Sequence, residues 1–403
     1  MKETIKLISV EDAAAIIKNE AEDFGIEEVP FQHALGRILK EAILADREMP
    51  PFNRVSMDGI AINSSVFESG NRQFEIEGVQ AAGSEQLSLH HSENCLEAMT
   101  GAMLPFGTDA VIPYELVTIE DNLAKVHIED VSYFQNVHQQ GLDRKKNDIL
   151  IQKNTKLSSA EIGILATVGK TRVKVATFPK VAIISTGDEL VDVNQTPKPF
   201  QIRKSNVHNL LALLETKGIH AHSYHLRDNK TELKQKIKKY LGAYDVLMFS
   251  GAVSKGKFDF LPEILNELGV KKLFHKVQQR PGKPFWFGKK NKTTVFAFPG
   301  NPVSTYVSCL KYFFPWLSYS QTDMADSRTQ AILATDFHFK PNLTYFLQVK
   351  LQNERGCVMA YPEAGNGSGD LANLTLSDAF LELPPNKNEF KKGEVYPVIQ
   401  YRF

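Results

Sequence analysis

The sequence predicts a multidomain protein of the α/β plus β class, and three observations support that prediction. Residues 179–317 alternate apolar strand patterns with amphipathic helix patterns, which is typical of βαβ units and a mostly parallel sheet. Residues 50–140 show short strands separated by turns, and residues 330–403 are again rich in strand patterns. The chain has 403 residues, enough for about two to four domains at roughly 150 residues each.

These patterns divide the chain into parts. Residues 50–140 form a small β-rich domain, and residues 178–317 form the α/β domain. Residues 1–49 together with 141–177 supply a linking α+β domain of helical and strand segments. Residues 318–403 form a C-terminal β domain.

Composition excludes several classes of protein. Hydrophobic residues make up 42% and charged residues 23%, as in soluble globular proteins. Lys plus Arg and Asp plus Glu are both 47, and the resulting net charge of zero argues against a broad nucleic-acid surface. The 3 scattered cysteines form no zinc motif or disulfide framework, which favours a reducing cytoplasm. We find no signal-peptide core and no apolar run of membrane-spanning length, so no membrane is expected.

The elements of the first half follow from their periodicity. Residues 10–40 are helical in pattern. Residues 74–77 alternate apolar and acidic side chains, as in a half-buried strand, and residues 116–119 and 125–128 flank a polar turn and predict a hairpin. Residues 158–169 predict a helix with a capping serine at its start and a glycine at its end.

The α/β region shows the clearest alternation of elements. Its carboxyl-terminal boundary is marked by Pro315 and the polar stretch 318–326, which together predict a linker. The predicted strands are 181–185, 220–226, 245–249, 271–277, 284–287 and 294–298, and the predicted helices are 206–217, 231–240, 260–268 and 303–313.

Candidate chemistry collects where strands of this region end. Ligands of an open parallel sheet bind beyond the carboxyl ends of the strands. The glycine-bearing loops 186–190, 250–259 and 298–302 all follow strands. Backbone N–H groups freed by glycine, with Ser250 and Ser254, can hold a phosphate.

Charged residues accompany these loops. Asp188, Glu189 and Asp259 supply carboxylates for a magnesium ion, which favours one or two carboxylates plus ligand phosphate. One charge pair at roughly 4 Å near a protein surface is worth about 4 kcal/mol before desolvation, so zero net charge does not prevent anion binding. Each loop alone commonly serves as a turn or a helix cap, but their combination predicts a site for an anionic ligand. The accompanying cations are Lys276, Arg280 and Lys283.

The β-rich half offers weaker candidates. Residues 56–59 (SMDG) follow a proline-containing polar loop, and an Asx turn is the more ordinary interpretation. Residues 99–102 and 141–143 likewise place a hydroxyl or carboxylate beside glycine. The 11 histidines show no HxxxH or HExxH pattern, so a histidine metal site is not predicted.

Taken in order, these motifs resemble the MoeA family, the molybdopterin molybdenumtransferases, to which the gephyrin E domain is similar. Order and spacing agree over nearly the whole chain. The related molybdopterin adenylyltransferases share only the motifs TGDEL (186–190) and PGNP (299–302). The segments SMDG (56–59) and MTGA (99–102) therefore separate the two families. The matching stretches are residues 50–61, 99–115, 141–143, 184–190, 204–206, 250–260, 280–288 and 298–304.

The resemblance implies a fold, a reaction and partners. The central α/β domain is expected to be MogA-like, within four-domain subunits of a homodimer whose cleft lies between the α/β domain of one subunit and the β domain of the other. The implied reaction inserts molybdate into adenylylated molybdopterin with release of AMP and needs Mg²⁺. A molybdopterin adenylyltransferase and molybdoenzyme apoproteins are implied partners.

The resemblance also assigns residues. Arg280 stands where the family usually has a second lysine. The implied metal ligands are Glu189 and Asp259, and the implied catalytic residues are Asp58, Thr100, Asp143, Asp259, Lys276 and Arg280. The implied substrate-binding residues are Thr186, Gly187, Asp188, Glu189, Ser205, Asn206, Asp228, Ser250, Gly251, Ser254, Lys283, Pro299, Gly300, Asn301 and Pro302.

The chain departs from the family pattern at four places. Ala252 replaces a glycine, Leu343 stands where an arginine is usual, and 372–373 (Ala-Asn) replaces a serine pair. Residues 203–204 (Arg-Lys) add positive charge. These departures keep open a non-catalytic molybdopterin-binding or scaffold protein, beside the alternative of an adenylyltransferase; a nucleotide-dependent oxidoreductase would need the G-x-G-x-x-G motif that the chain lacks.

Overall fold

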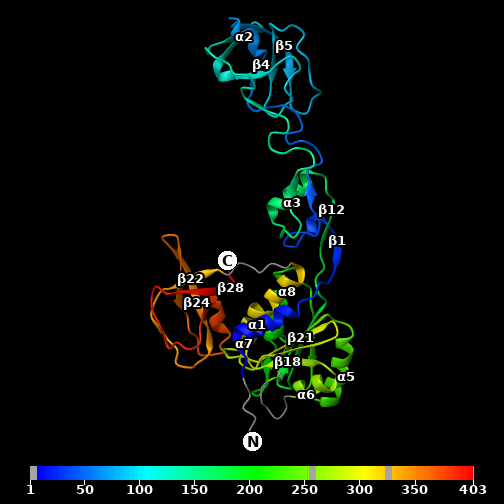
Figure 1. The fold of residues 1–403 in the computed structure, drawn as a ribbon, viewed down its shortest axis with the longest axis vertical. Coiled ribbons are helices and arrows are strands. Elements are labelled where there is room, and N and C mark those ends of the chain that lie inside the picture. Colours follow the sequence, from blue (N-terminus) through cyan, green and yellow to red (C-terminus); the bar gives the residue numbers. More distant parts are fainter. Residues whose placement is uncertain (1–6, 252, 254–259, 323–328, 403) are drawn as a thin grey trace. The chain divides into compact units, whose positions relative to one another are not determined.

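The computed structural model describes residues 7–251, 253, 260–322 and 329–402 (Figure 1). The chain divides into two compact units, one of Met1–Glu27 with Ala176–Phe403 and one of Glu28–Val175. No helix within the described ranges is long and apolar enough to cross a membrane.

The Glu28–Val175 unit carries a sheet with the strand order β7-β4-β6-β5-β9-β8. The predicted alternation is confirmed, because Phe74 and Ile76 are buried in its core. The predicted hairpin is confirmed too: β8 and β9 are antiparallel, and Asp121 and Asn122 adopt φ values of 48° and 63°, as tight hairpin turns require. The strands are β4 (Gly59–Ile62), β5 (Gln73–Gln80), β6 (Cys95–Ala98), β7 (Ala110–Pro113), β8 (Val117–Glu120) and β9 (Leu123–Val126).

Two helix predictions for the first half have different outcomes. Helix α3 (Ser159–Thr167) begins at a capping box formed by Ser158 and Glu161, as predicted. The prediction of helix over 10–40 is wrong beyond α1 (Val10–Asn19). Gly25 adopts a φ of 88°, and the following strand β1 (Ile26–Pro30) pairs with β12 (Arg172–Ala176), so tertiary pairing overrides the local pattern.

The central sheet of the other unit has the strand order β16-β13-β17-β21-β20-β18. Strands β16, β13, β17 and β21 are mutually parallel, whereas β20 and β18 join antiparallel, so the prediction of a mostly parallel sheet is confirmed. The strands are β13 (Val181–Thr186), β16 (His222–Leu226), β17 (Val246–Ser250), β18 (Lys271–His275), β20 (Trp286–Lys290) and β21 (Thr293–Phe298).

Helices cover both faces of this sheet. Val181 and Ile183 of β13 pack with α4 and α7, whereas Ala182 and Ile184 pack with α5 and α6, because successive strand residues face opposite sides. The helices are α4 (Asn206–Glu215), α5 (Lys230–Leu241), α6 (Leu261–Glu267) and α7 (Pro302–Ser308).

The predicted linker at Pro315 is wrong. Helix α7 continues through η3 (Cys309–Phe313), a π-helical turn, into α8 (Phe314–Gln321). Pro315 lies in the first turn of α8, directly after the π-helical turn. Trp316 and Leu317 are buried in the main core, and their burial favours the continued helix. Of the predicted linker, residues 323–326 lie outside the described ranges.

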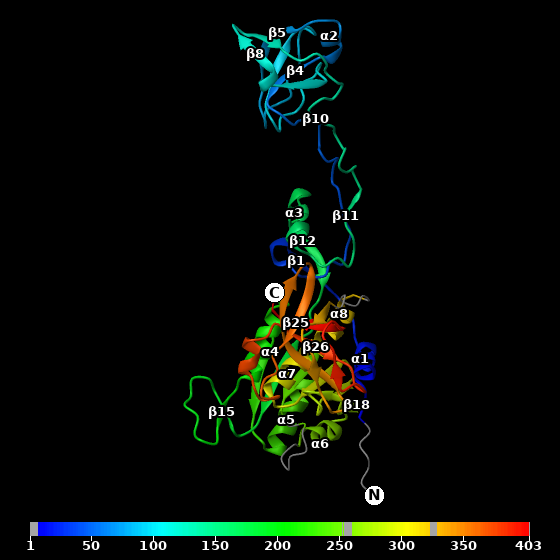
Figure 2. The same ribbon diagram turned by 90° about the vertical axis from the view of Figure 1, so that its left-hand side faces the viewer.

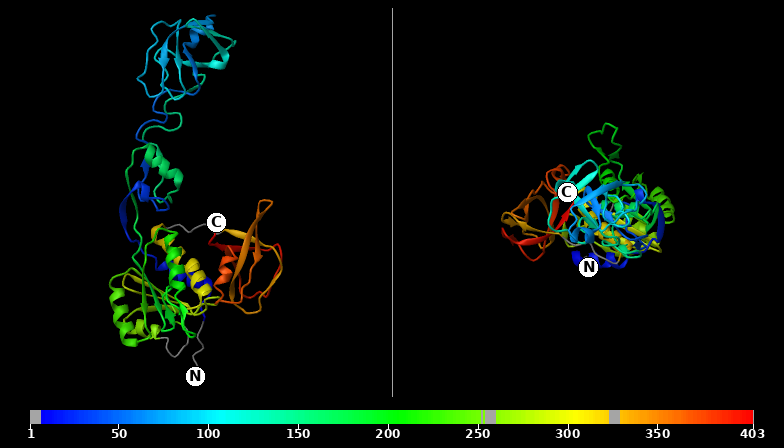
Figure 3. Two further views of the ribbon diagram at one scale, coloured as in Figure 1. Left: turned by 180° about the vertical axis from the view of Figure 1, so that it is seen from behind. Right: turned by 90° about the horizontal axis from the view of Figure 1, so that it is seen from above.

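The C-terminal strands form a sheet with the order β19-β24-β25-β22-β28-β26, and β24 also pairs with β26, so the sheet is barrel-like. Its first strand, β19 (Gln279–Arg280), comes from the central region of the chain. Figure 3 shows α7 lying between the central sheet and these strands, where its apolar side chains join Phe346 and Phe380 in one core. The other strands are β22 (Gln330–Leu333), β24 (Thr344–Glu354), β25 (Cys357–Pro362), β26 (Ala379–Leu383) and β28 (Val395–Gln400).

Candidate functional site

The three predicted loops meet at the carboxyl end of the central sheet. The strand register aligns Ser185 with Ser250, and Ser250 with Phe298, so β13, β17 and β21 end side by side. The N–H of Gly251 donates to the carbonyl of Phe298 at 3.1 Å and joins two of the loops. A first cavity of about 540 Å³ opens there. The residues that the sequence predicts for the site and that line this cavity are Thr186, Gly187, Glu189, Ser205, Asn206, Asp228, Ser250, Gly251, Gly300, Asn301 and Pro302.

Asn206 ties the loops of the first cavity together. Its Nδ2 donates to Ser250 Oγ at 2.9 Å and to the carbonyl of Gly300 at 2.6 Å. Its Oδ1 is buried and has no hydrogen-bond partner among the described residues. The side chain therefore fixes the spacing of the second and third loops and keeps one acceptor unused.

Glycine is required in the first of these loops. Gly187 has a φ of 130°, and a Cβ at this position would lie 2.4 Å from Glu189 Oε2. The absence of a side chain lets the Glu189 carboxylate fold back over the loop. At Gly300, by contrast, a Cβ would make only an ordinary van der Waals contact, 3.7 Å from Gly251 Cα.

Both signs of charge line the first cavity. Glu189 and Asp228 supply carboxylates, and Arg203 and Lys204 supply cations. Lys204 is paired with Asp192, and this hydrogen-bonded ion pair lowers the pKa of Asp192. Residues 190 and 202 belong to the short paired strands β14 (Leu190–Val191) and β15 (Ile202–Arg203), at the base of an arm that projects from the sheet (Figure 2).

The carboxylates fit a hard divalent cation. Within the described ranges, no group of three His, Cys, Asp or Glu side chains gathers closely enough to hold a metal ion alone. Mg²⁺ is commonly held by only one or two carboxylates plus phosphate oxygens of a ligand, a role that Glu189 and Asp228 suit. The Asp188 carboxylate faces the backbone N–H of Asp228 at 3.4 Å. Two predicted site residues, Ser254 and Asp259, lie outside the described residues.

A second cavity of about 320 Å³ adjoins the first. Arg280 and Lys283 line it, and it shares Gly300 and Asn301 with the first cavity. Lys276 is not among the described residues that line either cavity. The three predicted cations therefore do not share one site: Arg280 and Lys283 line the second cavity, and Lys276 does not. Pro299 of the predicted set also lines it.

The C-terminal domain closes the second cavity with its glycine-rich loop. Asn301 Nδ2 donates to Ser368 Oγ at 2.6 Å, and the N–H of Val303 donates to the Ser368 carbonyl at 3.1 Å. The sequence interpretation missed Ser368 as a site residue, although the glycine-rich stretch 365–369 was the available signal. Arg203 and Lys204 also line the site, although in the sequence they stand out only as departures from the family pattern.

The departures from the family pattern can be placed. Leu343 lines the second cavity, so an apolar side chain stands there instead of a cation. Asn373 is buried, and its amide donates to the carbonyl of Glu363, which is a structural role. Arg203 and Lys204 add their charge to the first cavity. Ala252 lies outside the described residues.

The Glu28–Val175 unit holds the remaining predicted residues. Asp58 Oδ1 accepts the backbone N–H of Thr100 at 2.6 Å, and this bond lowers the pKa of Asp58. Asp58 thus bonds across 42 positions of sequence and not to its own turn. Asp143 Oδ1 lies 2.9 Å from His138 Nε2, and Arg54 Nη2 lies 3.4 Å from the other ring nitrogen.

Comparison with known proteins gives a consistent result over the chain. The model of the MoeA N-terminal region (domain I and II) matches residues 8–169, that of the probable molybdopterin binding domain residues 182–319, and that of the MoeA C-terminal region (domain IV) residues 330–401. A molybdopterin molybdenumtransferase of Synechocystis is 41% identical over 396 residues, covering 97% of this chain and 99% of the relative. The chain belongs to the MoeA family of transferases. The predicted family and enzyme class are thereby confirmed.

Further relatives agree with this membership of the MoeA family. The molybdopterin molybdenumtransferase of Bacillus subtilis is 30% identical over 408 residues, covering 98% of this chain and 94% of the relative. The crystal structure of a molybdopterin biosynthesis MoeA protein from Pyrococcus horikoshii superposes with a TM-score of 0.82 at 29% identity, covering 99% and 100% of the two chains. The predicted fold class is confirmed, and the matches outside the central domain argue against the adenylyltransferase alternative.

Proposed function

We propose that this MoeA-family protein takes adenylylated molybdopterin and molybdate, releases AMP and leaves molybdenum bound to the dithiolene sulfurs of molybdopterin. The observation that supports this proposal is a pair of adjoining cavities with different chemistry. The first has glycine-bearing loops with two carboxylates and two cations, and the second has two cations and no carboxylate among its described lining residues. A ligand that bridges Gly300 and Asn301 can reach both.

The first cavity suits the nucleotide-like end of the substrate. Ligands of parallel sheets bind at such strand ends, and backbone N–H groups of glycine loops hold phosphate oxygens without adding side-chain charge. Asn206 keeps an acceptor oxygen without a described partner there, and Ser250 presents a hydroxyl at the same edge. Glu189 and Asp228 would hold Mg²⁺, which supplies charge neutralisation and polarisation of a phosphoanhydride.

The second cavity suits molybdate. A tetrahedral oxyanion needs cations and hydrogen-bond donors together, and Arg280 and Lys283 supply fixed positive charge. Such groups also offset negative charge that develops during transfer. Because the two cavities share a wall, molybdate bound beside the first ligand would be placed for transfer without diffusing away.

The acids of the Glu28–Val175 unit complete the proposal. We place Asp58, Thr100 and Asp143 at the reacting end, contributed by the partner subunit of a homodimer. The lowered pKa of Asp58 extends the range in which its carboxylate is ionised to lower pH. We further propose a cytoplasmic location, delivery of substrate by a molybdopterin adenylyltransferase and transfer of product to molybdoenzyme apoproteins.

The test is release of AMP from adenylylated molybdopterin by the purified chain. We expect release to require both molybdate and Mg²⁺. A binding or scaffold protein, an alternative favoured by Leu343 in the second cavity, would bind molybdopterin and release no AMP. In a strain that lacks its own transferase, full rescue of molybdoenzyme activity by both Asp58→Asn and Asp259→Ala would reject the roles of these two acids.

A further inference from the structure

The turn that carries both cations of the second cavity is held from two sides. Strand β19 pairs in parallel with β24, with Gln279 opposite Thr344 and Arg280 opposite Tyr345. On the other side, the N–H of Gln278 donates to the carbonyl of Ile8 at 2.7 Å. The backbone on the amino-terminal side of the turn is therefore fixed before the chain reaches residues 281–283.

A buried side-chain relay supports the turn from beneath. Gln279 is 0% exposed. Its Oε1 accepts a hydrogen bond from the Tyr312 hydroxyl, and its Nε2 donates to the carbonyl of Pro281 at 3.0 Å. Burial raises the pKa of Tyr312, so its hydroxyl stays protonated and remains a donor. The Tyr312 ring is itself fixed by stacking on Phe285, with centroids 4.9 Å apart.

The turn is closed tightly onto this relay. Gly282 has a φ of 91°, and a Cβ at this position would lie 2.6 Å from Gln279 Nε2 and 2.9 Å from Ser308 Oγ. Both neighbours are fully buried. No side chain fits between the turn and the relay, so a change in the Gln279 amide is transmitted to the peptide that joins Arg280 to Lys283.

The relay begins in the π-helical turn η3, which also anchors the C-terminal sheet. Lys311, the neighbour of Tyr312, is buried and forms an ion pair with Glu382 of β26 at 2.6 Å. Single π-helical turns are frequent at functional sites, because they rotate side chains out of the regular helical sequence. Here one turn of helix contacts both the C-terminal sheet and the cation-bearing turn.

We propose that Gln279 and Tyr312 are positioning residues that hold Arg280 and Lys283 in the geometry that binds the oxyanion substrate. The inference rests on the proposed function of the second cavity and adds two buried residues: Gln279, which lies at the edge of that cavity, and Tyr312, which is not among its described lining residues. Substitution changes the orientation of the cations and not their number. The expected signature is weaker binding of molybdate, while the first cavity and its ligand are unaffected.

The experiment uses the full chain with Tyr312→Phe and Gln279→Glu. Tyr312→Phe keeps the ring, removes the donor and adds no charge. Gln279→Glu keeps the shape and replaces the Nε2 donor by an acceptor, but it also adds a carboxylate at the edge of the cavity, so Tyr312→Phe is the deciding variant. Tyr306→Phe is the matched control, because Tyr306 lies on the same continuous helix and packs against Tyr401, away from the turn. Molybdate affinity is measured by calorimetry, KM and kcat by AMP release, and folding by thermal unfolding.

We expect both relay variants to weaken molybdate binding and raise its KM by about tenfold, the size expected for one lost buried hydrogen bond. The KM for adenylylated molybdopterin and the affinity of the control should stay within about twofold of wild type. Unchanged molybdate affinity in folded Tyr312→Phe would overturn the inference, as would equal weakening by Tyr306→Phe or an equal loss for both substrates. If Gln279→Glu does not fold, Tyr312→Phe decides alone.

Wild-type protein that binds molybdate without releasing AMP would defeat the proposed function only, and the affinities would still decide the inference. Wild-type protein that binds no molybdate would overturn both.

Discussion

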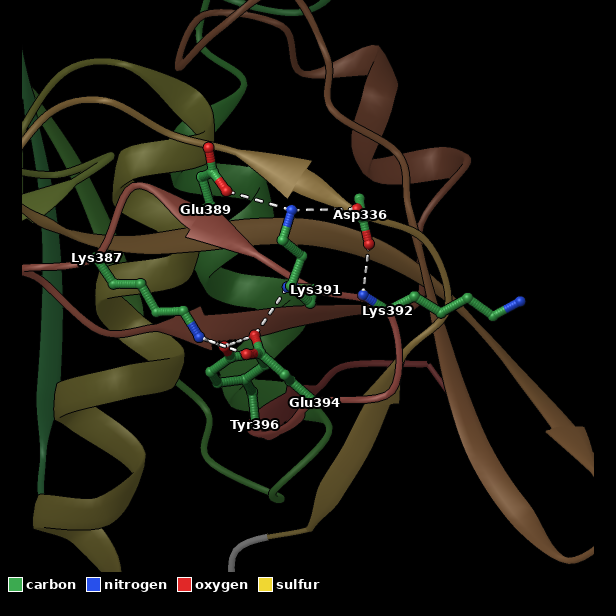
Figure 4. A network of polar contacts seen from close by, with 7 residues as sticks. All are labelled: Asp336, Lys387, Glu389, Lys391, Lys392, Glu394 and Tyr396. Carbon is green, nitrogen blue, oxygen red and sulfur yellow. Dashed lines mark hydrogen bonds and ion pairs between the residues drawn. The ribbon is translucent and has the colours of Figure 1, made fainter.

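Charged side chains are paired with one another in one region of the molecule, whereas some of those that line the two cavities have no ion-pair partner among the described residues. On the C-terminal domain, Lys387, Glu394, Tyr396, Lys391, Glu389 and Asp336 form a C-terminal charge network (Figure 4). In the two cavities, by contrast, Glu189, Arg280 and Lys283 form no ion pair with any other described residue. Charges that are paired internally contribute to the fold, whereas charges that line a cavity without a partner are available to a ligand.

The pKa values reflect the same difference. Hydrogen bonds from Lys387, Tyr396 and the Lys391 N–H lower the pKa of Glu394 to about 2. The carboxylates of the network in turn raise the pKa values of Lys387 and Lys391. Glu394, Lys387 and Lys391 are thus held in their charged forms by their neighbours. Such exposed pairs generally contribute little to stability, so their removal should affect folding slightly and catalysis not at all.

The largest expected effect comes from removing a cation of the second cavity. We predict that Arg280→Met or Lys283→Met lowers kcat/KM for molybdate about 100-fold, because a positioned charge on a developing oxyanion is lost. Steady-state AMP release at varied molybdate measures this. The matched control is Lys391→Met, which removes a cation from the network. Loss of activity in the control comparable to that of Arg280→Met would break the comparison.

A smaller effect is expected for the carboxylates of the first cavity. We predict that Glu189→Gln and Asp228→Asn each raise the Mg²⁺ concentration needed for half-maximal AMP release about tenfold, because one charged ligand of the cation is lost. A titration with Mg²⁺ at saturating molybdate measures the shift. Glu389→Gln, an acid of the network, should leave the titration unchanged; a midpoint unchanged in all three variants would remove these two residues from the metal site.

The smallest effect concerns stability and pH. The folded pKa of Glu394 is depressed from 4.5 to about 2, so its contribution is present above pH 4.5 and is lost as the pH falls toward 2. We predict that Glu394→Gln lowers the melting temperature slightly at neutral pH and that its difference from wild type disappears over that window. Thermal unfolding from pH 7 to pH 2 measures it. A difference that grows as the pH falls would contradict the prediction.

Much of the fold could be predicted because its signals are local. The capping box at Ser158 and the alternation around Phe74 depend on residues close in sequence, and both were correct. The helix that continues past Pro315 could not be predicted, because it is favoured by burial of Trp316 in a core assembled from distant segments. Strand β19 has two residues and pairs with β24, which begins 65 positions along the chain from it, so no local pattern reveals it.

The site, like the fold, could be predicted only where its signals follow from the order of strands and loops. The register of a parallel sheet brings Thr186, Ser250 and Gly300 to one edge, so the first cavity follows from loop order alone. The division of the cations between cavities depends on how the C-terminal domain packs. Ser368 reaches Asn301 only through tertiary contact, and the buried Gln279 carries no motif. Chemistry that follows strand ends could therefore be predicted, and chemistry that depends on contact between domains could not.

The central claim is that the two adjoining cavities hold the substrate and the oxyanion side by side. A crystal of the full chain grown with AMP and tungstate, a heavier oxyanion of the same shape as molybdate, tests it most directly by anomalous diffraction. The account predicts a tungsten peak within the cavity lined by Arg280 and Lys283, and nucleotide density beside Glu189 and Asp228. A tungsten peak at an unrelated surface, with neither cavity occupied, would contradict it.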